Sequence, residues 1–302
     1  MTAPSAVPVK FGVDAIVTQV RAQPGMLRVD EAQAFTENFF RQVPADDIAS
    51  RDAESWAKLA MAMFEFMRER RPGQAKIRVF NPVVEQDGFD SSHTVIAIAT
   101  DDMPFLVDSV SMAITAAGLA TKIVIHPLYR TERDADGKVQ FIADDDADRG
   151  LHESLMVFEV DRIAEAAELE QLREGVRVAI DDVRASVADW PKMKQRLLAI
   201  AEEFPQRTLP FDASLLEEAG AFLRWVAEDH FTFLGFREYR VIGGGDNEVL
   251  EAVDGSGLGI LKATERGLAP RSVKSLAAQD LEKSGAVGAI ILTKTNARSH
   301  VH

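Results

Sequence analysis

The sequence predicts an α+β fold: an antiparallel sheet of ferredoxin-like type with helices on one face, preceded by N-terminal helices and followed by a second α+β subdomain. Residues 93–189 alternate between the two-residue period of strands and the longer period of helices, in the order strand, helix, strand, strand, strand, helix. A strand-like run at residues 76–84 precedes this unit. The length of 302 residues also exceeds what one core usually uses, so several subdomains are expected.

The first 75 residues are predicted to form a loose arm and helices. Residues 1–28 lack a clear period and are interrupted by Pro24-Gly25. A short helix with three phenylalanines should end at Pro44, and Ser50 or Asp52 should cap the next helix. The apolar stripe of this second helix consists of Trp56, Leu59, Ala60, Met63, Phe64 and Met67. The same helix contains Met61, Met63 and Met67. We interpret these methionines as core or partner contacts, not as a cofactor site.

The predicted sheet combines one edge strand, one buried strand and a hairpin. Pro82 restricts the run at 76–84 to an edge or an end of the sheet. Residues 93–100 place two isoleucines on one face and two alanines on the other. Asp134 to Gly137 (DADG) is a hairpin-turn signal. The remaining strands are expected at residues 122–133, 139–142 and 154–160.

Two long helices are predicted around these strands. Asp101-Asp102-Met103-Pro104 is a helix-start signal, and Gly118 is a natural residue after a helix end. A second helix has a narrow apolar seam, and another helix follows from Trp190 to Phe204. The seam consists of Leu169, Leu172, Val176, Ile180, Val183 and Val187. After a linker at 205–210, a helix and strands at 231–242, 248–253 and 287–293 are expected.

A ferredoxin-like unit usually ends with a strand after its second helix, and none is evident before the linker. We therefore hypothesise that residues 76–84 occupy the vacant edge of the sheet. The predicted organisation has four parts. These are the arm and helices (1–75), the sheet domain (76–190), a helix and linker (191–210), and a second α+β subdomain (211–302) that is expected to be truncated.

Composition excludes several classes of function. The net charge of −14 argues against a broad surface for nucleic acid or for an anionic membrane. The absence of cysteine excludes disulfides, thiolate nucleophiles and Cys-ligated metals, and it is compatible with a cytoplasmic location. The N-terminus has no apolar signal-peptide region, and no stretch reaches the length of a membrane span.

Six runs of the sequence resemble the N-terminal region of the large-type bacterial NAD-dependent glutamate dehydrogenases. They occur in a consistent order, and the resemblance covers roughly residues 33–302. The runs are HTVIAIATDDMPFLVDSVSMAITAAGL (93–119), KIVIHPLYRTERDADGKV (122–139), ESLMVFEVDR (153–162), DHFTFLGFREYRV (229–241), GSGLGIL (255–261) and ILTKTNARS (291–299).

The resemblance implies a fold, a parent activity and partners. The family's N-terminal region contains regulatory ACT-like domains, with PAS-like and helical segments nearby, so residues 76–190 are expected to be ACT-like and 211–302 ACT- or PAS-like. The parent enzyme would interconvert L-glutamate and 2-oxoglutarate plus ammonia with NAD. This chain would hold no cofactor and no catalytic residues. Its expected partners are other copies of itself, the downstream catalytic domain and an amino-acid effector.

The candidate ligand site is the turn between the first strand and the first helix of the ACT-like unit. A helix N-terminus there offers unpaired N–H groups to a carboxylate. The predicted site residues are Asp101, Asp102, Met103, Phe105 and Asp108. Many amino-acid-binding ACT domains have glycine at the position of Phe105, whose side chain could fill the ligand space.

Other candidate sites have simpler explanations. Gly255, Gly257 and Gly259 have the spacing G-x-G-x-G, which does not fit a dinucleotide loop, so a structural turn is favoured. The acidic run at 144–148 lacks a calcium-loop pattern and is interpreted as a solvated loop. The histidines are isolated except for His300 and His302, so no metal site is predicted.

Two alternative functions stay open. The chain could be a stand-alone module that senses a free amino acid, or a structural scaffold that binds no ligand. Calorimetry with a panel of amino acids distinguishes them, because only the sensor releases binding heat.

Overall fold

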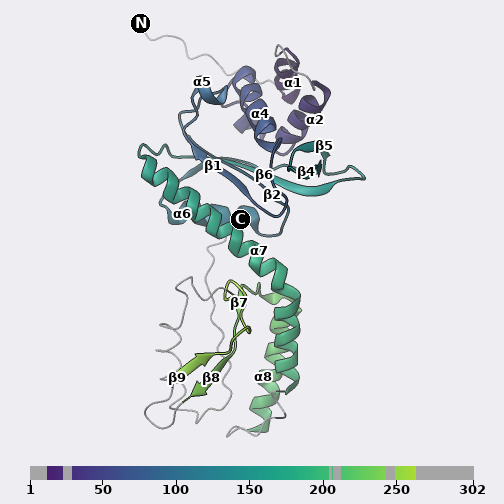
Figure 1. Ribbon diagram of the computed structural model, residues 1–302, viewed down its shortest axis with the longest axis vertical. Coiled ribbons are helices and arrows are strands. Elements are labelled where there is room, and N and C mark those ends of the chain that lie inside the picture. The colour runs from purple at the N-terminus through teal and green to yellow at the C-terminus, as the bar shows by residue number, and fades with distance from the viewer. Residues whose placement is uncertain (1–11, 23–28, 204–205, 207–211, 243–248, 263–302) are drawn as a thin grey trace. The chain divides into compact units, whose positions relative to one another are not determined.

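A computed structural model describes residues 12–22, 29–203, 206, 212–242 and 249–262 of the chain (Figure 1). The chain divides into two compact units, Met1–Ile180 and Asp181–His302, which are considered one at a time. The four domain ranges derived from the sequence stay predictions. Within the described residues, no helix is both long and apolar enough to span a bilayer.

The first unit is built on a six-stranded sheet in which all neighbouring strands are antiparallel (Figure 1). The strand order is β1-β2-β6-β4-β5. β4 pairs with residues 151–154 of β6, and β3 pairs with residues 157–160 of the same strand. The predicted α+β class is therefore confirmed. The strands are β1 (Lys76–Phe80), β2 (Thr94–Asp101), β3 (Thr121–Ile125), β4 (Leu128–Arg133), β5 (Val139–Asp144) and β6 (Leu151–Val160).

The hypothesis that the run at 76–84 fills the vacant edge is also confirmed. β1 lies at one end of the sheet and pairs only with β2, in a register that joins Lys76 to Ala99 and Phe80 to Val95. Pro82 lies just outside the strand, where its missing N–H breaks no ladder bond. The N-terminal segment thus supplies the strand that the ferredoxin-like order lacks.

Helices cover both faces of the sheet. On one face lie α6 (Leu106–Ala116) and the first part of α7 (Ala166–Glu203), as the sequence predicted (Figure 1). On the other face lie α1 (Val13–Arg21), α2 (Val29–Phe40) and α4 (Ala53–Met67), whose position the sequence did not indicate. The two single-turn helices of this unit are α3 (Ala45–Ile48) and α5 (Val84–Asp87).

The prediction of a loose arm over residues 1–28 was wrong for α1. Ile16, Val17 and Val20 recur at helical spacing and are buried in the core, but this stripe was too short to recognise without its partner helices. Asp52 caps α4 by accepting a hydrogen bond of 2.8 Å from the Ser55 N–H, so the cap prediction is confirmed for Asp52. Pro44 begins α3 instead of ending α2.

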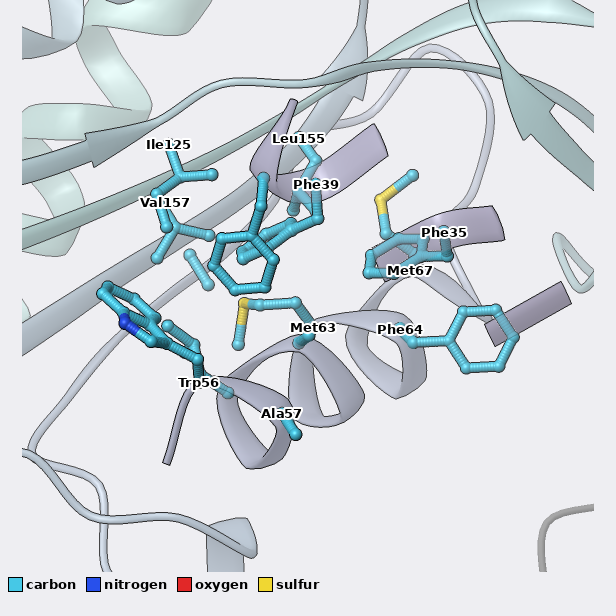
Figure 2. Packing of buried hydrophobic residues seen from close by; sticks show 14 of the residues in the cluster. Phe35, Phe39, Trp56, Ala57, Met63, Phe64, Met67, Ile125, Leu155 and Val157 are labelled. Carbon is cyan, nitrogen blue, oxygen red and sulfur yellow. The ribbon is translucent and has the colours of Figure 1, made fainter. Parts of the chain in front are cut away.

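The core of the first unit joins α1, α2 and α4 to the sheet. Figure 2 shows part of the cluster of buried residues that contains Phe35, Trp56 and Met63 together with Leu155 and Val157 of β6. The Phe35 ring stacks on Tyr129 of β4 with centroids 4.7 Å apart, and the Tyr129 hydroxyl donates to the Phe35 carbonyl at 3.0 Å. Both rings are almost fully buried, so the stacking adds to a large burial of apolar surface. Met63 and Met67 are core residues and Met61 packs against them, as predicted.

Two buried glutamates of β6 bind arginines that flank α4. Strand periodicity places Glu153 and Glu159 on the same face as Leu155 and Val157. The Arg51 guanidinium, just before α4, donates to both Glu159 oxygens at 2.9 and 2.5 Å. Arg70, just after α4, donates to Glu153 Oε1 at 2.7 Å. The helix is therefore held to the strand at both ends of an apolar interface.

Local strand and helix bounds differ from the sequence prediction in two places. The expected strand 122–133 is broken at His126-Pro127 into β3 and β4, since proline cannot donate a ladder hydrogen bond. The two helices expected on either side of Trp190 form one helix, α7, that contains Pro191. Buried Ser186, Asp189 and Met193 anchor both sides of that proline, so packing offsets the lost helical hydrogen bond.

The second unit contains the rest of α7, α8 (Ala213–Trp225), a kinked turn η2 (Val226–His230) and two small antiparallel sheets. The expected strand 231–242 is interrupted and begins only at Gly235, and the strand at 248–253 is present as β9. The strand pairs are β7 (Gly235–Phe236) with β10 (Leu258–Gly259), and β8 (Tyr239–Ile242) with β9 (Val249–Ala252). The strand predicted at 287–293 lies outside the described residues.

Candidate functional site

The predicted ligand turn connects the end of β2 to α6. β2 ends at Asp101, and α6 begins at Leu106 with Phe105 as its N-cap residue. The expectation that the aspartates open the helix was wrong, because α6 starts later and neither one caps it. With no side-chain cap, the first N–H groups of α6 are left for water or an anion. A helix N-terminus is a general anion-binding feature, and ligand binding at this turn stays a prediction.

Phe105 has a left-handed backbone, with φ 69° and ψ 9°. This conformation costs most residues about 1–2 kcal/mol, and glycine adopts it without strain. The Phe105 side chain is 45% exposed and lies outside the core. The Phe105 side chain is therefore largely open to solvent at the start of α6.

Of the other predicted site residues, Asp101 forms an ion pair within the protein, and the side chains of the rest are partly or largely exposed to solvent. Asp101 accepts a hydrogen bond of 2.8 Å from Arg70 Nη2. The Asp102 N–H donates to the His152 carbonyl at 3.1 Å, while the side chains of Asp102 and Asp108 are exposed. Met103 is half-buried. The structure thus places the five residues along one short turn, but it gives only Asp101 a side-chain ion pair at this site.

Sequence reasoning missed the buried charges next to the turn. Glu153 binds Arg70, and its two oxygens also accept hydrogen bonds of 2.7 Å from Nε and Nη2 of Arg133. Burial alone would raise the pKa of Glu153, but the hydrogen bonds and charges of Arg133 and Arg70 lower it below its usual value. The available signal was a glutamate inside an otherwise apolar strand, which predicts a buried cationic partner.

A second missed group is the pair of His126 and Ser154. His126 lies between β3 and β4, and its Nε2 is 2.7 Å from the Ser154 hydroxyl oxygen, which is fully buried. Burial lowers the pKa of His126 below its usual 6.5, and the charge of Asp102 opposes this effect. The imidazole is therefore mostly neutral near pH 7.

The glycine-rich loop is a structural turn, as favoured from the sequence. A Cβ at Gly257 or Gly259 would collide with backbone oxygen atoms of Leu261 or Leu234. The Gly259 N–H donates to the buried Asp189 carboxylate at 3.1 Å. These close approaches explain Gly257 and Gly259 without a phosphate, and Gly255 has a positive φ of 73° that favours glycine.

The acidic run at 144–148 forms ion pairs within the protein. Arg41 lies 2.9 Å from Asp144 and 3.8 Å from Asp146, and His152 lies 2.6 Å from Asp145. Across the described residues, no group of three or more potential ligands could hold a metal ion. His300 and His302 lie outside those residues.

A groove of about 540 Å³ lies between α4 and β1. Its apolar lining includes Met61, Phe66 and Phe80. The charged side chains along it form ion pairs within the protein. These pairs are Lys58 with Glu54, Glu65 with Arg68, and Arg78 with Asp87.

Residues 35–176 match the family described as "Glutamate dehydrogenase, ACT1 domain". This segment belongs to the ACT1-domain family of glutamate dehydrogenase. The match begins within α2 and ends within α7, so it includes α4 on one face of the sheet and α6 on the other. The resemblance derived from the sequence runs is thereby confirmed.

Two curated relatives extend the similarity beyond the ACT1 domain. The NAD-specific glutamate dehydrogenase of Halomonas elongata is 33% identical over 236 residues, which are 77% of this chain and 15% of that protein. The enzyme of the same name from Pseudomonas aeruginosa is 29% identical over 236 residues, 78% of this chain and 15% of that protein. The matched part thus spans only a small fraction of these enzymes.

The left-handed backbone of Phe105 gives a stability prediction for the ACT1 domain. Phe105→Gly is expected to be more stable than Phe105→Ala by about 1 kcal/mol, because both lose the ring but only glycine relieves the strain. Urea unfolding of the two variants measures the difference. The order is opposite to that at ordinary helix positions, so equal stability or a more stable alanine variant would contradict the assigned backbone.

The buried His126 gives a pH prediction. Because its folded pKa lies below the unfolded value of 6.5, the unfolded state binds the proton first. The free energy of unfolding should therefore fall as the pH drops from about 6.5 toward the folded pKa. Urea unfolding between about pH 5 and 8 should show this slope for the wild type and a smaller one for His126→Gln. The control is His152→Gln, at a half-exposed site, which should keep the slope of the wild type. Equal slopes in the wild type and His126→Gln would refute the prediction.

Proposed function

We propose that this chain is a regulatory and assembly segment of an NAD-dependent glutamate dehydrogenase. The parent reaction would interconvert L-glutamate and 2-oxoglutarate plus ammonia, with NAD bound and the chemistry performed in a downstream domain of the same polypeptide. The main support is the ACT1 domain, a regulatory domain type, within a match that covers only 15% of the related enzymes. The purified chain is expected to form no NADH from glutamate and NAD; turnover by this chain alone would contradict the proposal.

Amino-acid sensing at the turn is the second candidate function. The uncapped N–H groups at the start of α6 favour a carboxylate, whereas the residue directly before them is Phe105, at the position where many amino-acid-binding ACT domains have glycine. We therefore assign the wild-type turn a role in packing. Replacing Phe105 with glycine should allow an amino acid to bind as it does at ACT turns that contain glycine.

Calorimetry with a panel of the common amino acids tests this assignment. The wild-type chain is expected to release no binding heat at millimolar ligand, and Phe105→Gly is expected to bind at least one amino acid. Phe105→Ala is the matched control, because it removes the ring but keeps a Cβ in the strained position. Binding by the wild type would favour the sensor, and silence of all three would favour the scaffold.

Self-association is proposed to use the outer edge of β3. Among the described residues, no strand pairs with β3 on the side away from β6. An antiparallel pair of two β3 strands centred on Ile123 would place Lys122 opposite Val124 of the second copy, with no like charges facing each other. The same pairing of two β1 strands centred on Arg78 would place arginine opposite arginine, which disfavours that edge.

Sedimentation velocity over a range of concentrations tests the β3 edge. Val124→Lys changes a side chain that is 39% exposed, so the fold should persist. In the paired form it would place lysine opposite Lys122 twice, which should weaken the dimer roughly tenfold. Leu151→Lys adds the same charge at a residue that is 72% exposed and should leave the dimer unchanged. A monomeric wild-type chain, or an equal effect of both variants, would refute the use of β3.

A further inference from the structure

Four charged side chains form a chain of ion pairs from the ligand turn into the protein. Asp101, at the end of β2, is partly exposed, with 38% of its side chain accessible. Arg70 Nη2 joins it to Glu153 with hydrogen bonds of 2.8 and 2.7 Å, and Glu153 in turn binds Arg133. The last three side chains are almost fully buried. Only Asp101 therefore gives this network direct access to solvent.

The buried end of the network holds the segment after α4 to the β4–β5 hairpin. Arg133 donates to the carbonyl oxygens of Met67 and Gly137 at 2.9 and 2.8 Å. The Arg70 N–H donates to the Gly137 carbonyl at 3.0 Å, and the Val139 N–H donates to the Arg68 carbonyl at 2.9 Å. The end of α4 and the hairpin are thus one hydrogen-bonded unit.

We propose that Arg70 couples the turn after β2 to the end of α4 and to the β4–β5 hairpin. A ligand or partner that draws the Asp101 carboxylate away from Arg70 would then loosen the contact between the N-terminal helices and the sheet. A regulatory role for this coupling rests on the proposed function of the chain. The coupling itself is a property of this domain.

The physical basis is the balance of buried charge. With Asp101 in place, two arginines face two carboxylates. Without the Asp101 charge, Arg70 and Arg133 share Glu153 alone, and one buried positive charge lacks compensation. Moving Arg70 toward water relieves this imbalance, and that movement carries the backbone at Arg70 away from Gly137.

Hydrogen–deuterium exchange of the whole chain tests the coupling. Asp101→Asn keeps the size of the side chain and removes its charge. Amide exchange at Arg70 and Val139, which lie outside the turn, is expected to rise about tenfold. Asp148→Asn removes the same charge at an exposed residue outside the network and should change neither amide. An increase confined to residues 101–105, or none at all, would overturn the proposal.

Thermodynamic coupling acts in both directions, so the hairpin should also affect the turn. A Cβ at Gly137 would lie 2.5 Å from the Arg70 carbonyl oxygen, so Gly137→Ala should push the two segments apart and raise exchange at residues 101–106. Gly88→Ala is the matched control, because Gly88 has a similar positive φ but no atom within 4 Å of the added Cβ. Equal exchange at the turn in both variants would refute the reciprocal effect.

These outcomes are separate from those that test the proposed function. If neither exchange experiment shows coupling, Arg70 does not connect the turn to the hairpin, but the regulatory assignment of the chain still stands. NADH formation by the chain would contradict the regulatory assignment, whereas the exchange results would still describe the domain.

Discussion

The architecture of the first unit depends on Glu153 and Glu159, two carboxylates buried on the core face of β6. Removing one partner of such a pair leaves an uncompensated buried charge, which typically costs about 3–5 kcal/mol. The apolar side chains between the glutamates supply most of the burial, but they do not fix the position of α4 along the strand. Arg51 and Arg70, on either side of α4, fix that position at two points.

This arrangement explains why the ACT1 family match starts in α2, well before the first strand of the ferredoxin-like repeat. The N-terminal segment supplies the edge strand β1 and covers the second face of the sheet. Consequently β2 is almost entirely buried, and its two faces carry different side chains. Ala97 and Ala99 allow the N-terminal helices to approach closely, while Ile96 and Ile98 fill the opposite face.

The candidate turn lies where this buried charge network reaches the surface. Phe105 holds a backbone conformation suited to glycine, and Asp101 next to the turn is tied to Arg70. Strained residues persist only when their surroundings hold them in place, and here the end of β2 and the start of α6 provide that restraint. The turn is therefore connected through Asp101 and Arg70 to the segment that follows α4.

The sequence by itself determined the α+β class, most of the sheet, the edge position of β1 and the family, because periodicity, turn residues and long ordered motifs are local signals. It also located the turn at Asp101 and the glycine loop. Only the tertiary structure decided that α1, α2 and α4 cover the second face, that α7 continues through Pro191, and that Arg70, Arg133 and Glu153 meet. Those features depend on contacts between residues far apart in the chain, where packing and charge compensation outweigh local propensity.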